Sequence, residues 1–152
     1  MKRIAITMGD PGGIGPEIIA KAVSSGEIRN ICIPLVIGDR IAMEEALSLL
    51  DLPLNLRIIR SPEESAAGSK TIDLIDMGIL NQFRGGKSTP EGGRACAAYI
   101  KKAVELALDK KVDAVVTAPI SKEALKMAGY GWPGHTEMLA ELTGTGDYAM
   151  ML

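Results

Sequence analysis

The stretch MGDPGGIGPE, residues 8–17, lies between two segments of different periodicity. The apolar run RIAIT before it, residues 3–7, is typical of a buried strand, and the sequence IIAKAV after it is typical of a helix. Pro16 suits the first turn of that helix, where a backbone N–H has no partner. Four glycines let the chain turn tightly and let other groups come close: Gly9, Gly12, Gly13 and Gly15. The stretch therefore predicts a strand, a glycine loop and a helix, the opening unit of an α/β fold.

The glycine loop is also a candidate functional site. A helix N-terminus exposes unpaired N–H groups and the positive end of the helix dipole, which favours an anion. Asp10 and Glu17 add negative charge there, so a metal, a hydroxyl or a cationic ring fits better than a bare phosphate. The dinucleotide-binding fingerprint is absent, because Ile18 stands where its third glycine belongs. The sequence does not decide between a loop that binds a ligand and a tight turn that binds none. If the loop binds a ligand, the candidate residues are Asp10, Gly12, Gly13 and Gly15.

Strand and helix patterns alternate along the rest of the chain. Apolar runs predict four further strands, over residues 31–37, 54–59, 71–76 and 113–117. Helical patterns begin at residue 40, after Ser88, after Ser121 and after Gly134, with a single turn at residues 61–64. This alternation predicts a three-layer α/β/α fold with a mostly parallel sheet. Such sheets bind ligands at the carboxyl ends of their strands, so the glycine loop and the later turns are expected to share that edge.

Some residues carry local expectations. Pro34 lacks the N–H that a central strand uses, which predicts an edge strand or a bulge. The alternating run TIDLID, residues 71–76, predicts a strand with one solvent-exposed face, whereas DAVVT, residues 113–117, predicts a buried strand. The run YAMML, residues 148–152, predicts the opening of an apolar strand, so the sequence is expected to be cut within a domain. Three side chains are expected to cap helices: Asp39, Ser88 and Thr136.

Composition limits the class of protein. The 152 residues correspond to one domain, and 47% hydrophobic residues are ordinary for a globular core. A net charge of −2 argues against nucleic acid or an anionic membrane as the main partner. Cys32 and Cys96 lie in apolar patterns, which indicates buried thiols in a reducing compartment. No signal peptide and no apolar run of the ~18 residues that a membrane span needs is present, so a cytoplasmic protein is expected.

A second glycine-rich turn, GGKST at residues 85–89, resembles the end of a P-loop. The first glycine of that motif would fall at Asn81, which disfavours a P-loop nucleotide enzyme. Lys87 and Ser88 still stand at a predicted helix N-terminus and are candidates for holding a carboxylate or a phosphate. The alternative, a capped helix in a loop without a ligand, is equally open.

The turn TAPISK, residues 117–122, follows a predicted strand, where α/β enzymes place substrate groups. Ser121 and Lys122 are therefore candidate contacts for an anion, although spacing alone favours a solvated lysine. His135 is the single histidine and is followed by Thr136 at a predicted helix start. One histidine makes no metal site by itself, and the sequence offers no catalytic triad and no zinc-type cysteine spacing.

Four motifs in order resemble one family: MGDPGGIGPE, GGKSTPEGGR, VVTAPISKEAL and PGHTEMLAELTG. They are similar to those of the 4-hydroxythreonine-4-phosphate dehydrogenase family of vitamin B6 synthesis. The resemblance implies oxidation of the substrate's C3 hydroxyl by NAD or NADP, followed by loss of CO2, with a divalent metal such as Zn, Mg, Co or Mn. It also implies the isocitrate/isopropylmalate dehydrogenase fold, with two α/β domains in a homodimer that shares its site.

Carried onto this sequence, the family's substrate-binding pair falls on His135 and Thr136. The family's metal-binding histidines belong to later motifs, so the resemblance implies no metal ligand in this chain. Residues 1–152 are expected to form the N-terminal α/β portion of a two-domain dehydrogenase that takes a small phosphorylated substrate. Ser121 stands where family members carry histidine or asparagine, which leaves 4-phospho-D-threonate and 4-phospho-D-erythronate as alternative substrates. A non-catalytic binding fragment is the third interpretation.

Overall fold

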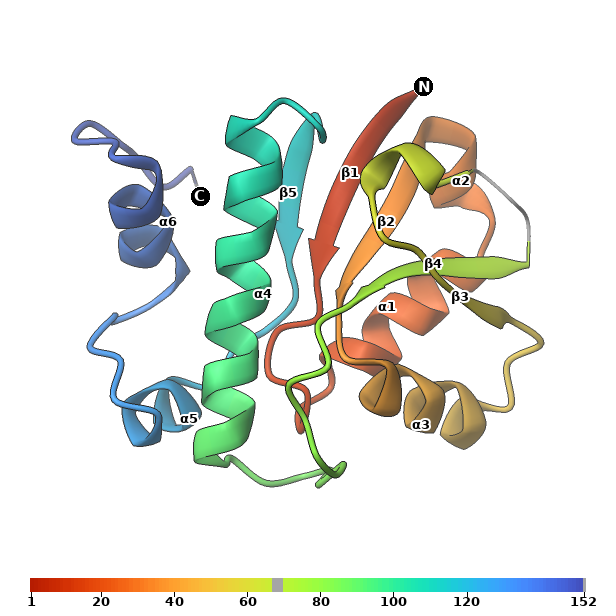
Figure 1. Cartoon of the computed structure of the whole chain (residues 1–152), viewed down its shortest axis with the longest axis horizontal. Helices are drawn as coiled ribbons and strands as arrows, with labels where there is room; N and C mark the ends of the chain where they lie inside the picture. Colours follow the sequence, from red (N-terminus) through yellow and green to blue (C-terminus); the bar gives the residue numbers. More distant parts are fainter. Residues whose placement is uncertain (67–69, 152) are drawn as a thin grey trace.

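The computed structural model describes residues 1–66 and 70–151, which form one parallel sheet covered by helices (Figure 1). The order across the sheet is β3-β4-β2-β1-β5, and every adjacent pair of strands is parallel. The strands are β1 (Lys2–Thr7), β2 (Cys32–Gly38), β3 (Asn55–Ile58), β4 (Thr71–Asp76) and β5 (Ala114–Thr117). The predicted parallel α/β sheet is confirmed.

Helices cover both faces of the sheet. Helices α1 (Gly15–Ser24) and α3 (Arg40–Leu50) pack together on one face, whereas α4 (Pro90–Leu108) crosses the other (Figure 1). The chain moves from β1 to β2 in one direction and from β4 to β5 in the other, and right-handed crossovers then place the helices on opposite faces. The remaining helices are α2 (Glu27–Ile31), the 3-10 turn η1 (Pro62–Glu64), α5 (Lys122–Met127) and α6 (His135–Thr143). The three-layer prediction is confirmed.

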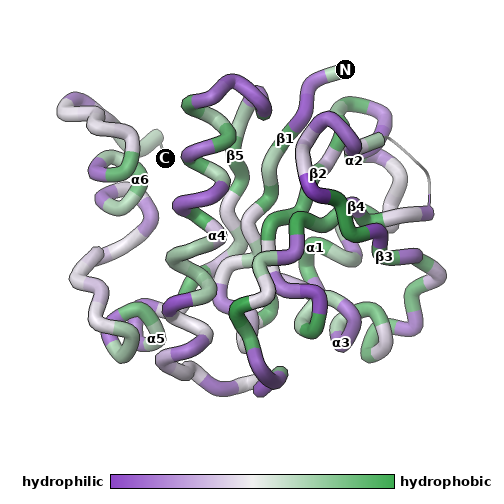
Figure 2. Tube along the Cα trace, in the orientation of Figure 1, coloured by the Kyte–Doolittle hydropathy of each residue, from purple (hydrophilic) through white to green (hydrophobic). Residues whose placement is uncertain are grey.

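The core has two parts that meet along α4. The larger part fills the space between the sheet and its helices, and Figure 2 shows hydrophobic residues along β2 and β4. The smaller part lies between α4, α5 and α6, where Cys96, Ile100, Leu125 and Met138 are buried. Met138 therefore holds α6, and with it the start of that helix at His135, against α4.

Strand β2 is central, so the expectation of an edge strand or bulge at Pro34 was wrong. β1 pairs with β2 in continuous register from Lys2 opposite Cys32, and Pro34 lies opposite Ile4. β4 pairs with β2 only from Val36 onward. Pro34 is tolerated because it precedes the part of β2 that bonds to β4.

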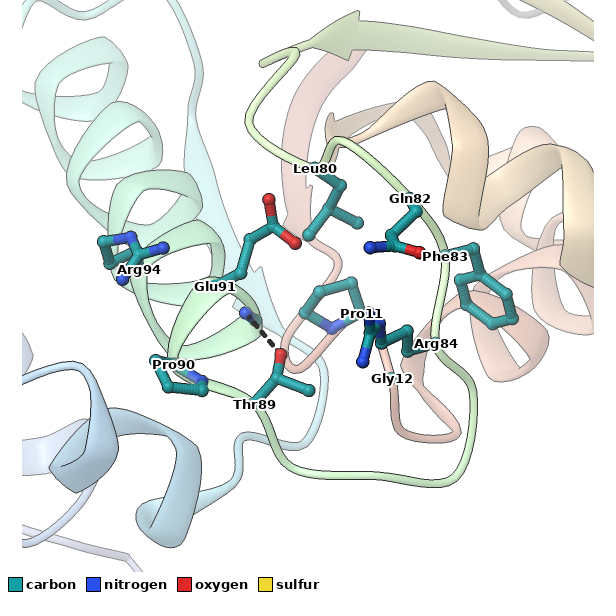
Figure 3. A pocket seen from close by; sticks show the side chains of 11 residues that line it. Pro11, Gly12, Leu80, Gln82, Phe83, Arg84, Thr89, Pro90, Glu91 and Arg94 are labelled. Atoms are coloured by element: carbon teal, nitrogen blue, oxygen red, sulfur yellow. Dashed lines mark hydrogen bonds between the residues drawn. The ribbon is translucent and has the colours of Figure 1, made fainter.

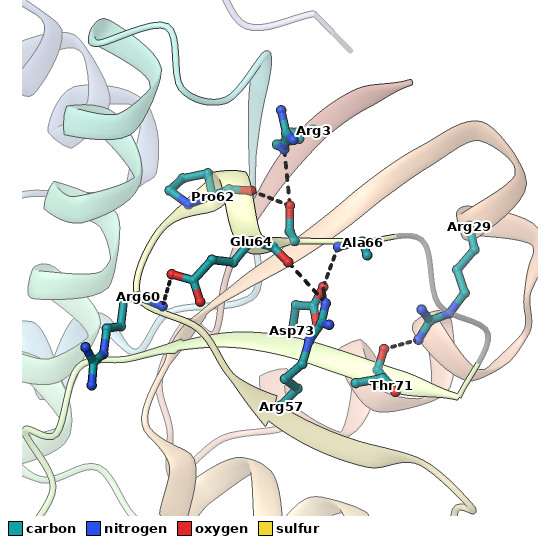
Figure 4. Close-up of polar contacts among 10 residues, drawn as sticks. Arg3, Arg29, Arg57, Arg60, Pro62, Glu64, Ala66, Thr71 and Asp73 are labelled. Carbon is teal, nitrogen blue, oxygen red and sulfur yellow. Dashed lines mark hydrogen bonds and ion pairs between the residues drawn. The ribbon is translucent and has the colours of Figure 1, made fainter.

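Strand β4 has no solvent-exposed face, so the expectation of one was wrong. Ile72, Asp73, Leu74 and Ile75 are all buried because helices cover both faces of the sheet. The Asp73 carboxylate accepts hydrogen bonds from Arg57 Nε at 2.7 Å, from Arg57 Nη2 at 2.8 Å and from the backbone N–H of Ala66 at 2.8 Å (Figure 4). The polar residue inside this strand therefore ties β3 and the segment after η1 to β4, which compensates its burial.

Strand β5 is an edge strand and not the buried strand that was expected. Among the described residues only β1 pairs with it, and Val116 is 51% exposed. The predicted strand at residues 148–152 was also wrong for its described part. Residues 148–151 form no strand, and Tyr148, Met150 and Met151 are exposed. Apolar sequence alone makes no strand where no neighbouring strand supplies hydrogen bonds.

The loops that follow β1, β4 and β5 meet at the carboxyl edge of the sheet. The backbone N–H of Asp10 donates to the carbonyl of Pro119 at 2.9 Å, and that of Gly86 donates to the carbonyl of Gly12 at 2.7 Å. Gly9 has φ +73°, and a Cβ atom there would lie 2.2 Å from the Pro119 carbonyl oxygen. The glycine is therefore required both by its backbone conformation and by the crossing of the two chains.

Gly9→Ala should destabilise the fold by about 3 kcal/mol or more, because the added methyl group forces the loops apart. Gly78→Ala is the matched control, since Gly78 has φ +59° with no atom within 4 Å of a built Cβ. Its cost should be limited to the backbone conformation, about 1 kcal/mol. Urea unfolding of both variants measures the difference. Equal losses of stability would show that the crossing at Gly9 contributes nothing beyond its φ angle.

Candidate functional site

The candidate site lies at the carboxyl ends of β1 and β5, next to each other in the sheet. The chain leaves β1 toward α1 on one face and enters β5 from α4 on the other, which makes this position a topological switch point. Ligands of open α/β sheets bind in the crevice at such points. The prediction that the glycine loop, the GGKST turn and the TAPISK turn share one edge is confirmed by the bonds between them.

Asp10 turns its carboxylate inward from the glycine loop. It is 6% exposed, and its Oδ1 accepts the backbone N–H of Gly12 at 3.1 Å. A Cβ built on Gly92 would lie 3.2 Å from the same oxygen, so the carboxylate rests against the first turn of α4, where an anion is favoured. Burial raises the pKa of Asp10, and the Gly12 hydrogen bond acts in the opposite direction.

The glycines of this loop are explained by close packing between chain segments. A Cβ on Gly12 would lie 2.7 Å from the Lys87 carbonyl oxygen, and one on Gly15 would lie 2.1 Å from the Met8 carbonyl oxygen. Gly13 is exposed, and its N–H donates to the Asp10 carbonyl at 3.0 Å. The tight-turn interpretation therefore accounts for the contacts of the loop, and its role as a ligand loop stays a prediction.

Two serines join the turns that carry the candidate anion contacts. Ser88 Oγ and Ser121 Oγ are 2.8 Å apart, and Ser121 Oγ also accepts the backbone N–H of Ala124 at 3.0 Å to cap α5. The expected cap of α4 by Ser88 was wrong, because Thr89 Oγ1 accepts the N–H of Gly92 at 2.9 Å instead. Ser88 is thereby left to bond across to Ser121.

Lys87 and Lys122 flank this serine pair. Both side chains are exposed, and within residues 1–66 and 70–151 neither ammonium group forms an ion pair. Each lysine is adjacent in sequence to one member of the bonded pair, so both cations belong to the same part of the carboxyl edge. Two cations beside two hydroxyl groups are a donor set suited to an anionic, hydroxylated ligand.

His135 begins α6 and reaches the end of β5. Its ring interacts with the backbone of Ala118, and Nε2 is buried without a hydrogen-bond partner in the described part of the chain. The expected cap of α6 by Thr136 was wrong. Gly134 occupies the N-cap position, and no side chain forms a cap hydrogen bond there. His135 and Thr136 line a pocket of about 350 Å³ together with Leu139, Ala140, Thr143, Tyr148, Ala149 and Met150.

A larger pocket of about 380 Å³ opens between the glycine loop, the segment after β4 and the first turns of α4 (Figure 3). Arg84, Glu91 and Arg94 line it. Glu91 accepts hydrogen bonds from the backbone N–H of Asn81 at 3.1 Å and from its Nδ2 at 2.7 Å, and these bonds, with smaller contributions from Arg94 and Arg84, lower the pKa of Glu91. Of the residues that line this pocket, only Gly12 was a candidate from the sequence. The available signal was the spacing of Glu91 and Arg94 on one helical turn.

In the segment that resembles a P-loop, one backbone N–H of the turn is already occupied. The N–H of Gly86 is bonded to the carbonyl of Gly12, and Asn81, in place of a glycine, holds Glu91. Residues 1–66 and 70–151 contain no group of three His, Cys, Asp or Glu side chains that could hold a metal ion. In the same ranges no helix has the length and hydropathy required to cross a membrane.

The single histidine gives a direct test of this geometry. Burial lowers the pKa of His135 below its ordinary value of 6.5, and the Ala118 backbone offsets part of that shift. As the pH falls below 6.5 the unfolded chain takes up the proton first, so the free energy of unfolding should decrease from pH 8 toward pH 5. The decrease should be smaller in His135→Gln. NMR titration of the imidazole reports the pKa, and a value at or above 6.5 would contradict the buried placement.

Comparison with known proteins agrees with the fold. A family model described as "Pyridoxal phosphate biosynthetic protein PdxA" matches residues 30–152. The chain is 50% identical over 150 residues to the D-threonate 4-phosphate dehydrogenase of Cupriavidus necator and 48% identical over 153 residues to the 4-hydroxythreonine-4-phosphate dehydrogenase of Trichlorobacter lovleyi. These matches cover 98% and 99% of this chain but only 45% and 46% of the relatives. The chain thus spans less than half the length of these relatives.

A solved structure shows the same relationship. The 4-hydroxythreonine-4-phosphate dehydrogenase of Klebsiella pneumoniae superposes with a TM-score of 0.93 at 43% identity, over 99% of this chain and 46% of that one. The resemblance carried by the four sequence motifs is thereby confirmed for the family. The matched residues and the shared five-stranded parallel fold show that this chain belongs to the PdxA family of pyridoxal phosphate biosynthetic proteins.

Proposed function

We propose that this chain is the N-terminal portion of a two-domain dehydrogenase that oxidises and decarboxylates 4-hydroxythreonine-4-phosphate with NAD or NADP, in vitamin B6 synthesis. The observation that carries the proposal is the group of side chains at the carboxyl edge: two lysines without an ion pair among the described residues, two hydroxyl groups and an imidazole. The names of the relatives supply the reaction class, since they are dehydrogenases of phosphorylated four-carbon acids. A cytoplasmic location and a homodimer that shares its site are parts of the same proposal.

A second candidate substrate is D-threonate 4-phosphate, which carries a hydroxyl group in place of the amino group. Ser121 favours it, because a neutral hydroxyl pair with Ser88 gives an ammonium group no negative partner. The one carboxylate of the glycine loop that lies nearby, Asp10, is buried and bonded to Gly12. The relative from Cupriavidus necator is named for this substrate.

The residues of this chain would bind and orient the substrate. Lys87 and Lys122 would attract its phosphate and carboxylate groups, and His135 and Thr136 would hold its hydroxyl groups in one orientation. NAD or NADP supplies hydride-transfer chemistry when it is bound. The pocket in Figure 3 offers Arg84 and Arg94 to nucleotide phosphates and Glu91 to a hydroxyl group, so its residues fit that cofactor. The described residues do not fit a divalent metal, whose ligands would come from outside this chain.

The proposed reaction is tested by following NADH or NADPH formation with each of the two substrates and a divalent metal. The assay compares this chain alone with this chain joined to the C-terminal remainder of the Cupriavidus necator relative, which is 50% identical over the shared part. Activity only in the joined protein supports the proposal, and the better substrate decides between the two candidates. A folded joined protein that oxidises neither substrate would overturn it.

Lys122→Ala in the joined protein should raise the Michaelis constant for the substrate by about 10-fold to 100-fold, because a charge-assisted hydrogen bond contributes about 1.5–3 kcal/mol. Lys126→Ala is the matched control, since Lys126 is exposed in the last turn of the same helix, away from the serine pair. Initial rates across a substrate range give both constants. The same Michaelis constant in the two variants would remove Lys122 from the site.

A further inference from the structure

Asp39 belongs to none of the motifs used in the proposed function. Its buried carboxylate nevertheless accepts hydrogen bonds close to the pocket of Figure 3. It follows β2 directly and is 1% exposed. Although it occupies the N-cap position of α3, its side chain makes no cap hydrogen bond there. The expected cap by Asp39 was therefore wrong, and its carboxylate is directed elsewhere.

Both oxygens of Asp39 accept hydrogen bonds from distant parts of the chain. Oδ1 accepts the backbone N–H of Ile79 at 2.6 Å and that of Leu80 at 3.0 Å. Oδ2 accepts the hydroxyl of Tyr99, in the middle of α4, at 2.5 Å. Burial and the neighbouring carboxylate raise the pKa of Tyr99, so it remains the donor. One carboxylate thus joins the end of β2, the start of the β4–α4 connection and α4.

That connection forms a wall of the pocket in Figure 3. Leu80, Gln82, Phe83 and Arg84 come from it, and we call residues 80–84 the pocket wall. Residues 77–89 contain no helix or strand. Apolar side chains of this segment pack against the core: Met77, Ile79, Leu80 and Phe83. Near the wall its backbone is held by hydrogen bonds from Met77 to Gly38, from Ile79 and Leu80 to Asp39, from Asn81 to Glu91 and from Gly86 to Gly12, and Ser88 and Thr89 bond further along. The Asp39 carboxylate is itself buried, and its bonds to Ile79 and Leu80 are charge-assisted and lie where the wall begins.

We propose that Asp39 is a positioning residue: its carboxylate, held by Tyr99 in the middle of α4, fixes the start of the pocket wall relative to that helix. The wall then presents Arg84 opposite Glu91 and Arg94 in the arrangement of Figure 3. Asp39 touches no ligand in this account and acts only through residues 79–84. The kinetic consequence rests on the proposed function, whereas the effect on the wall does not.

Amide hydrogen exchange of the chain tests the proposal directly. In Asp39→Asn, which keeps the size of the side chain and removes its charge, the amides of Ile79 and Leu80 should exchange at least about 10-fold faster, since hydrogen bonds to a charged group are about twice as strong as neutral ones. Amides of the β1–β2 ladder should keep their rates relative to the wild type. A uniform acceleration across the sheet would show that Asp39 contributes only to global stability and would overturn the proposal.

Tyr99→Phe is the matched variant, because it removes the donor to Oδ2 and leaves both bonds of Oδ1 in place. Its acceleration at Ile79 and Leu80 should be smaller than that of Asp39→Asn, and equal or larger acceleration would contradict the assignment. In the joined protein, Asp39→Asn should raise the Michaelis constant for the nucleotide about 5-fold or more with little change in kcat. Faster exchange at Ile79 and Leu80 with an unchanged Michaelis constant would support the role of Asp39 in positioning the wall. It would exclude a role of the wall in binding the nucleotide.

Discussion

The crossing of the β1 and β5 loops at Gly9 and Pro119 is the contact on which the carboxyl edge depends. The hydrogen bond from the Asp10 N–H to the Pro119 carbonyl joins the two loops, and the 2.2 Å separation available to a Cβ at Gly9 leaves room for glycine alone. The loop after β5 continues to Ser121, whose hydroxyl bonds to Ser88. The same loop contacts the ring of His135 through the backbone of Ala118. A shift at the crossing would therefore move most of the candidate substrate contacts together.

Three buried aspartates hold loops of this fold: Asp10 and Asp39 at the carboxyl edge, and Asp73 within β4. Asp10, Asp39 and Asp73 are all at most 6% exposed, and each accepts at least one backbone N–H from a loop. Asp73 also forms an ion pair with Arg57. Buried carboxylates that bond to loop amides replace the hydrogen bonds that irregular backbone lacks, which holds loops in one conformation. Preorganised loops at a strand edge are what a binding site on an α/β sheet requires.

Much of the fold could be predicted from the sequence because its signals are local. Strand runs, the prolines at residues 16 and 90 and the glycine loop follow from periodicity and backbone chemistry, and the parallel three-layer sheet follows from their alternation. The errors concern tertiary choices. Ser88 bonds to Ser121 and leaves the cap of α4 to Thr89, Pro34 lies in a central strand, and Asp39 bonds across the molecule, since each outcome depends on partners far away in sequence. The pocket of Arg84 and Arg94 was missed for the same reason, because its two walls meet only in the folded chain.

We propose that the carboxyl edge of this chain holds the groups that recognise a phosphorylated four-carbon acid. The most direct measurement is a titration of the ¹⁵N-labelled chain with 4-hydroxythreonine-4-phosphate and, in parallel, D-threonate 4-phosphate, followed by two-dimensional NMR. Chemical shift changes should concentrate in residues 86–89, 118–122 and 135–136, while amides of β3 and of the last turn of α3 stay unchanged. Shifts centred elsewhere, or none with either compound at millimolar concentration, would contradict it.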